Sequence, residues 1–218
     1  MNGRTCWIGT DESGKGDYFG PLVIAGVSVN KNQINRLKEL GVKDSKKLSD
    51  NKIKELSKII KKEFINSLVT ISPEKYNKLW GRMKNLNRIL AWGHARVIEN
   101  ILQLTYCDRA ISDKFGDEKF IERALMKKGK QIIIEQKEKA EEDLAVAAAS
   151  ILARAQFLNE MEKISSEIGV ELKKGSSQEV KEIAKKLIEE KGTEVLDRIA
   201  KKHFRITKTL LLNEKNSY

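Results

Sequence analysis

The sequence predicts a layered α/β domain in which a sheet is flanked by helices. Strand-like segments come early and alternate with helical segments later, an order that favours a layered fold over a helical bundle. The chain from about residue 170 onward is helical and markedly basic. It contains no internal repeat, low-complexity segment or Pro/Gly/Ser-rich linker, so we expect residues 1–218 to form one domain with a helical C-terminal extension.

The N-terminal half is expected to begin with two strands joined by a turn. Residues 5–10 form a short apolar run, and residues 21–29 are rich in β-branched side chains. The segment DESGKGDYFG between them carries three glycines, which predict a turn that begins at the two acids. Ser49 is a suitable N-cap for a helix over residues 50–63, and residues 64–71 follow as a strand.

The C-terminal half alternates helices with brief strands. Residues 86–104 have the apolar period of a helix, and residues 144–161 form the clearest helix, with a face of small side chains that would pack closely on a sheet. The remaining elements are shorter: strand candidates at residues 109–112 and 131–135, and helices at about 117–127, 178–190 and 193–204.

Composition and charge favour a globular protein that attracts polyanions. No apolar run approaches the ~20 residues of a membrane span, and a strand-like segment starts too early for a secretory signal, so we expect a cytoplasmic protein without a membrane partner. The net charge of +11 favours nucleic acid, although a lysine-rich surface also serves solubility. Cys6 and Cys107 lack CxxC spacing and are expected to be buried free thiols.

Several enzyme classes lack their motifs in this chain. There is no GxSxG and no HExxH sequence, and His94 and His203 lie far apart without metal-ligand spacing. The glycine segment Gly14–Gly20 is one residue too long for a dinucleotide fingerprint, and it lacks the GK[ST] ending of a P-loop.

Acidic residues are instead the chemical candidates. Asp11 and Glu12 follow an apolar strand, Asp113 follows a second strand, and Glu141 and Asp143 belong to a cluster at the start of the small-residue helix. Scattered acids at strand and helix ends suit oxygen ligands for a hard cation, although they also commonly cap turns and helices. Asp11-Glu12 next to a Gly-Lys-Gly turn is the stronger feature, because the glycines would let backbone N–H groups approach a phosphate beside the metal.

The run GTDESGKGDYFGPLVIAGV closely resembles the opening motif of the type 2 ribonucleases H, and its DYFGP ending resembles the ribonuclease HIII branch. The segments KDSKKLS, LAVAAASILAR, NLNRILAWGHARVIENIL and the ending KKGSS...IAKKHFRITK agree with that branch. The similarity therefore extends over nearly the whole chain, in the order of the family. Ribonuclease HIII enzymes usually carry an additional N-terminal domain that grips the hybrid, which the residues before Asp11 do not supply.

The resemblance implies a ribonuclease H-like mixed five-stranded sheet and an endoribonuclease that cuts the RNA strand of RNA–DNA hybrids, leaving a 5′-phosphate and a 3′-hydroxyl. It implies four carboxylates that hold two Mg²⁺ or Mn²⁺ ions. By motif, Asp11, Glu12 and Asp113 are three of them. Glu141 follows Lys-Ala as the fourth acid of the family does, but its spacing to Ser150 is one residue shorter than the family pattern, so Asp143 competes with it.

The resemblance also suggests where substrate would bind, and we expect the enzyme to be a monomer. The expected substrate contacts are Ser13, Gly14, Lys15, Gly16, Tyr18, Ser45 and Lys46. Tyr18 would equally serve as a core anchor, and Ser45-Lys46 as a polar loop. Further candidate contacts are the basic residues Lys173, Lys174, Lys181, Lys185, Lys186, Lys201, Lys202 and Arg205, most of which are expected to be solvated.

Two alternatives remain open. A ribonuclease HII-like enzyme would nick at single ribonucleotides in duplex DNA. A non-catalytic nucleic-acid-binding module would explain the basic charge, but it would have no use for clustered carboxylates, which repel phosphate unless a metal is present.

Overall fold

The structure is a computed structural model that describes residues 6–42, 48–117 and 119–215. Its residue contacts divide the chain into two compact units, which are described separately. The first unit comprises Met1–Ser13, Val23–Val69 and Asn85–Gln156, and the second comprises Gly14–Leu22, Thr70–Lys84 and Phe157–Tyr218. None of the described helices combines the length and apolar character needed to cross a bilayer.

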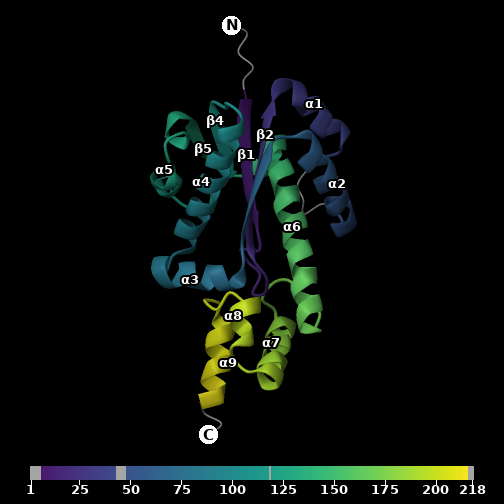
Figure 1. The fold of residues 1–218 in the computed structure, drawn as a ribbon, viewed down its shortest axis with the longest axis vertical. Helices are drawn as coiled ribbons and strands as arrows, with labels where there is room; N and C mark the ends of the chain where they lie inside the picture. The colour runs from purple at the N-terminus through teal and green to yellow at the C-terminus, as the bar shows by residue number, and fades with distance from the viewer. Residues whose placement is uncertain (1–5, 43–47, 118, 216–218) are drawn as a thin grey trace. The chain divides into compact units, whose positions relative to one another are not determined.

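A mixed five-stranded sheet runs through the fold in the order β3-β2-β1-β4-β5 (Figure 1). The strands are β1 (Cys6–Ser13), β2 (Leu22–Asn30), β3 (Asn66–Ile71), β4 (Arg109–Asp113) and β5 (Ile133–Lys137). β1 pairs antiparallel with β2, and it pairs parallel with β4, which in turn pairs parallel with β5. β1 is therefore the central strand, and the predicted α/β fold with a mixed sheet is confirmed.

Helices make up the other described elements. They are α1 (Lys31–Glu39), α2 (Asp50–Glu63), α3 (Pro73–Met83), α4 (Leu86–Leu104), α5 (Lys119–Ala124), α6 (Leu144–Ile168), α7 (Gln178–Lys191), α8 (Val195–Ile199) and α9 (Arg205–Lys215), with short 3₁₀ turns η2 (Gly129–Gln131) and η3 (Ala140–Glu142). The Ser49 hydroxyl accepts a hydrogen bond from the Lys52 N–H and caps α2, as predicted.

The two faces of β1 pack against different helices because side chains alternate along a strand. Thr10 contacts His94 of α4, and a Cβ on its β2 partner Gly26 would meet Val97 of the same helix. On the opposite face, a Cβ on Gly9 would lie 2.2 Å from the backbone of Ala145 in α6. Even-numbered residues of β1 thus face α4, and odd-numbered residues face α6.

Several expected element boundaries are wrong. β3 begins at Asn66, two residues later than predicted, and α6 continues to Ile168 and does not end at residue 161. β1 continues past residue 10, because its antiparallel pairing with β2 extends to Ser13, so Asp11 and Glu12 lie inside the strand and not at its end. The helix expected at residues 193–204 is only the short α8, which ends at Ile199 because Ala200 leaves the helical path and forms a β-bridge with Phe19; α9 begins after the expected range, at Arg205. β5 begins two residues later than the predicted strand.

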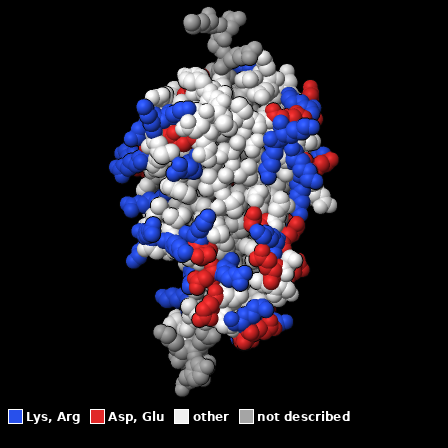
Figure 2. Space-filling view, in the orientation of Figure 1, with Lys and Arg blue, Asp and Glu red and all other residues white. Residues whose placement is uncertain are grey.

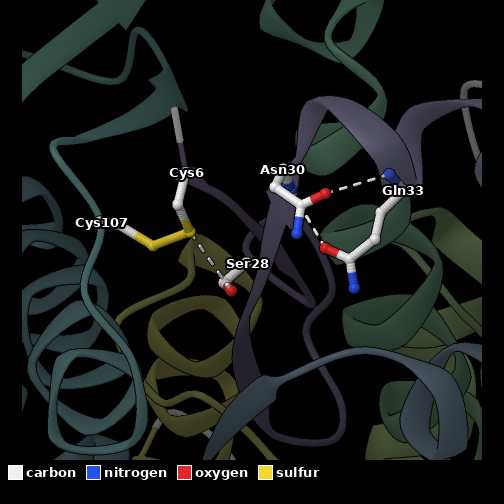
Figure 3. Close-up of a disulfide and its surroundings, with 5 residues drawn as sticks. All are labelled: Cys6, Ser28, Asn30, Gln33 and Cys107. Carbon is white, nitrogen blue, oxygen red and sulfur yellow. Dashed lines mark hydrogen bonds between the residues drawn. A yellow bond between two sulfur atoms is a disulfide. The ribbon is translucent and has the colours of Figure 1, made fainter. Parts of the chain in front are cut away.

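The cysteine expectation is also wrong, because Cys6 and Cys107 form a disulfide (Figure 3). Cys6 begins β1 and Cys107 precedes β4, and the parallel register of Trp7 with Arg109 places the two thiol positions side by side, with their Cα atoms 4.6 Å apart. The proximity depends on a pairing between residues 101 positions apart, which cysteine spacing does not reveal.

Candidate active site

Asp11 lies on β1 and faces α6, where the Ser150 side chain hydrogen-bonds to its carboxylate. Burial and, to a smaller extent, the negative charge of the neighbouring Glu12 raise the pKa of Asp11 to about 7. Hydrogen bonds from Ser150 and from the Glu12 N–H, at 2.8 Å, oppose this increase only in part. A carboxylate in such surroundings is stabilised by a nearby cation.

Asp113 is brought beside Asp11 by the sheet. The parallel register pairs Thr10 with Ser112, and the next residues on the two strands are Asp11 and Asp113. Both side chains follow paired residues by one position, so they project from the same face of the sheet. β4 ends at Asp113, which confirms the prediction that this acid terminates a strand.

Glu12 points to the opposite face. Its Oε2 lies 3.2 Å from Nε2 of His94, and its side chain is only 5% exposed. The pairing of β1 with β4 ends at Thr10, so no β4 residue pairs with Glu12. Among the described residues, no group of three or more His, Cys, Asp or Glu side chains is arranged to hold a metal ion. The structure therefore brings Asp11 and Asp113 together, whereas Glu12 is engaged by α4.

The two candidates for the fourth acid have different surroundings. Asp143 caps α6, because its Oδ1 accepts hydrogen bonds from the N–H groups of Ala145 at 2.8 Å and Val146 at 3.3 Å. It also accepts one from the indole N–H of Trp7 at 3.1 Å. Glu141 lies in η3, which packs against β4, and it has no hydrogen bond or ion pair among the described residues. This contrast favours Glu141 as the available carboxylate.

The glycine turn belongs to the second unit. Gly14 has a φ of +90°, and a Cβ there would lie 2.2 Å from the Pro21 carbonyl oxygen, so glycine is required. Lys15 and Gly16 are exposed, and Gly16 has open space around it. Tyr18 is fully buried, and its hydroxyl lies 2.9 Å from Thr207 Oγ1. Tyr18 is therefore a core anchor, the second of its two predicted roles, and is not exposed to substrate.

Lys201 was expected among the exposed basic residues, but it is fully buried in the second unit. Its Nζ donates to the carbonyl oxygens of Phe19 at 3.1 Å, Gly20 at 2.6 Å and Pro21 at 3.4 Å. Burial lowers the pKa of Lys201 to about 7, an effect that the charge of Asp17 opposes. Lys201 thus anchors the segment that follows the glycine turn and does not contact solvent.

The other basic candidates are mostly solvated. Lys173, Lys185, Lys186 and Lys202 form ion pairs with exposed acids of their own segments. Figure 2 shows acidic and basic side chains mixed over α7, whereas Lys and Arg predominate on the flanks formed by α2 and by α4 and α5. Ser45 and Lys46 lie outside the described residues.

Sequence reasoning missed two residues of this site, His94 and Ser150. His94 was set aside because it has no second histidine at ligand spacing, and Ser150 stands in an alanine-rich run that reads as packing. Both positions become informative only when the sheet faces are assigned, because their partners lie 82 and 139 residues away in the sequence.

The chain is similar over most of its length to known ribonucleases. The sequence model of the family described as Ribonuclease HII matches residues 8–207. The ribonuclease HIII of Protochlamydia amoebophila is 47% identical over 204 residues, which cover 94% of this chain and 68% of that protein. The ribonuclease HIII of Chlamydia pneumoniae is 43% identical over 201 residues, covering 91% and 67%. The chain spans about two thirds of the length of these relatives.

A solved structure gives the same result at the level of the fold. Bst-RNase HIII in complex with Mn²⁺ matches with a TM-score of 0.89 and 34% sequence identity, over 98% of this chain and 71% of that one. The ribonuclease H-like fold expected from the sequence motifs is thereby confirmed. The chain belongs to the ribonuclease HII family, on its ribonuclease HIII branch.

Proposed function

We propose that this protein is an endoribonuclease that hydrolyses the RNA strand of RNA–DNA hybrids with the help of divalent metal ions, leaving a 5′-phosphate and a 3′-hydroxyl. The observation that carries the proposal is the pair of carboxylates, Asp11 and Asp113, on one face at neighbouring positions of β1 and β4. The relatives named ribonuclease HIII and the Mn²⁺ complex of Bst-RNase HIII support the reaction class.

The oxygen donors of Asp11, Asp113 and Glu141 are the type of ligand that a divalent cation such as Mg²⁺ or Mn²⁺ takes. Asp11 is held where burial and the adjacent Glu12 disfavour its negative charge, which a cation would relieve. The side chains of Asp113 and Glu141 have no hydrogen bond or ion pair among the described residues, so their carboxylate oxygens are available as ligands. Two bound ions would activate a water molecule and stabilise the leaving oxygen. We assign Asp11, Glu12, Asp113 and Glu141 as the residues that hold them.

Substrate contacts are assigned to the segment that follows β1. Exposed Lys15 and Gly16 would contact the phosphate backbone, and the fixed conformation of Gly14 would aim backbone N–H groups at it. We also assign Ser13, the residue before Gly14, as a substrate contact. Selection for RNA requires a contact with the 2′-hydroxyl, which we assign to backbone groups of the same turn. We expect a cytoplasmic monomer that binds the hybrid through this turn and its basic surface.

The test is replacement of Asp11 by Asn, which preserves size and removes the charge. Cleavage of a hybrid in Mg²⁺ or Mn²⁺ is expected to fall about a thousandfold or more, because several kcal/mol of metal-dependent stabilisation is lost. The free energy of unfolding should not fall, because a buried charge is removed. A control, Asp197→Asn, removes an acid that pairs with Lys202 in the second unit and should leave cleavage unchanged. Metal-independent cleavage, or cleavage retained by Asp11→Asn, would refute the metal assignment.

A second substrate preference is supported by the family model, whose description is Ribonuclease HII. An enzyme of that type would cut at a single ribonucleotide in duplex DNA. Comparing cleavage of that duplex with cleavage of a hybrid separates the two substrate preferences. Parallel reactions with EDTA separate both from a non-catalytic nucleic-acid-binding module.

A further inference from the structure

His94 is a fully buried histidine whose two ring nitrogens both have partners in the first unit. Its Nδ1 lies 2.9 Å from Thr10 Oγ1, and its Nε2 lies 3.2 Å from Glu12 Oε2. Thr10 and Glu12 are two residues apart on β1 and project from the same face, so one imidazole on α4 spans both. A protonated Nε2 donates to the Glu12 carboxylate, whatever the state of Nδ1.

The imidazole has little freedom to move. It stacks on the ring of Phe115, which follows β4, with centroids 4.9 Å apart and an angle of 23° between the planes. The neighbouring Gly93 allows α4 to approach β2 so closely that a Cβ would lie 2.6 Å from Ile24. The imidazole is therefore fixed by α4, β1 and Phe115, two residues after Asp113, together.

The contact with Nε2 restrains the position of the Glu12 carboxylate. Glutamate has three side-chain torsions, and without a partner its carboxylate would sample several positions at the end of the sheet. Any second hydrogen-bond acceptor besides Thr10 would satisfy the buried imidazole. The acceptor in this protein is Glu12, the residue next to Asp11, so the contact also restrains a candidate metal ligand. Removing a side chain that hydrogen-bonds to a metal ligand lowers the metal affinity by about 10–100-fold.

We propose that His94 is a positioning residue that orients the Glu12 carboxylate for a divalent cation. The inference rests on the proposed function, because Glu12 is a metal ligand only there. His94 does not touch the ion or the substrate. Through its Nε2 contact, His94 holds the Glu12 side chain in one of its possible orientations.

Two amide substitutions separate the two hydrogen bonds of His94. In His94→Gln the amide nitrogen reaches approximately the place of Nε2, so the donor to Glu12 is retained. In His94→Asn the shorter amide reaches only the place of Nδ1, so the contact with Thr10 is retained and the contact with Glu12 is lost. His203→Asn, which changes the only other histidine, is the control.

The primary measurement is the affinity for Mn²⁺ alone, followed by titration with electron paramagnetic resonance. We expect His94→Asn to bind Mn²⁺ about 10–100-fold more weakly than wild type, and His94→Gln to remain within about threefold of it. Urea unfolding of each variant checks the fold. A second measurement needs no metal: the His94 imidazole resonances of the metal-free protein should shift in Glu12→Gln and not in Glu141→Gln.

The outcomes distinguish this inference from the function on which it rests. Wild-type protein that neither binds Mn²⁺ nor cleaves a hybrid would overturn both. Wild-type protein that does both, with equal Mn²⁺ affinity in His94→Asn and His94→Gln, would overturn the positioning role alone. If His94→Asn does not fold, unchanged His94 resonances in Glu12→Gln would overturn it equally.

Discussion

Adjacent acidic residues in this protein have separate environments because they lie on a strand. Asp11 faces α6 and bonds with Ser150, whereas Glu12 faces α4 and bonds with His94. Strand alternation thus directs two carboxylates that are adjacent in the sequence toward different helices, although the Glu12 charge still raises the pKa of Asp11. Asp11 and Glu12 can share a cation only if their side chains approach it from opposite faces of β1. This position lies beyond Thr10, the last residue of β1 that pairs with β4.

The hydrogen-bond partners of single residues distinguish Glu141 from Asp143. Asp143→Asn weakens the cap of α6 and the contact with Trp7, so we expect a loss of about 1 kcal/mol in unfolding free energy with a mild effect on cleavage. Glu141→Gln should leave stability unchanged and reduce cleavage severely, because no partner is lost among the described residues. Urea unfolding and hybrid cleavage measured side by side check both statements.

Two further acids serve as a control and as an alternative fourth carboxylate in that experiment. Exposed Glu142, next to Glu141 in η3, provides a matched control whose replacement by Gln should change neither quantity. Asp117, four residues after Asp113, caps α5 through a 3.0 Å hydrogen bond from the Lys119 N–H. If Asp117→Asn abolishes cleavage while Glu141→Gln does not, the fourth carboxylate lies in the connection between β4 and α5.

At the scale of elements, the close approach of α6 to β1 places Ser150 beside Asp11. Gly9 makes this approach possible, because any side chain there would occupy the first turn of α6. The alanine-rich beginning of the helix presents small side chains, all fully buried, from Ala147 to Ala149. A glycine on the strand and alanines on the helix thus allow the hydrogen bond between Ser150 and Asp11.

Gly9→Ala tests this packing. The added Cβ would lie 2.2 Å from backbone atoms of Ala145 and Val146, which cannot move as a flexible side chain does. We expect a destabilisation of about 3 kcal/mol or more, together with a loss of cleavage as Ser150 moves from Asp11. Gly81→Ala, in an exposed turn of α3 with open space around it, is the matched control and should stabilise the protein by up to about 1 kcal/mol. Equal stabilities for the two variants would contradict the close packing.

Periodicity and capping predicted elements whose signal is local. α2 and α4 have the predicted bounds, since each carries an apolar stripe, and α2 also has the Ser49 cap. α1 was missed, although the Asn30 side chain and Gln33 form a capping box there, because the helix buries only Leu37 and has little apolar period. α3 was missed because Ser72-Pro73 was read as the end of a strand, whereas it begins a helix.

At the scale of the whole molecule, the site depends on contacts that no local pattern carries. The family motifs identify Asp11 and Asp113, but the sequence does not reveal that β1 and β4 pair in the register that sets them side by side. Likewise, the buried position of Lys201 depends on carbonyl oxygens about 180 residues earlier in the chain. From the sequence alone, the pair Lys201-Lys202 is expected to lie on the solvated surface.

The net charge of +11 also acts through the whole molecule, and it leads to a prediction about binding. Each phosphate neutralised by a basic side chain releases counterions, so the affinity for a hybrid should fall as salt rises. With Asp11→Asn, which allows binding to be measured without cleavage, we expect the affinity to fall at least about tenfold between 50 and 200 mM salt, the effect of about two phosphate contacts. Lys15→Ala should lower both the affinity and this salt dependence, since it removes one exposed cation of the glycine turn. Lys185→Ala on α7, outside that turn, should change neither. Fluorescence anisotropy of a labelled hybrid measures both quantities, and an affinity independent of salt would mean that the basic surface does not contact the phosphates.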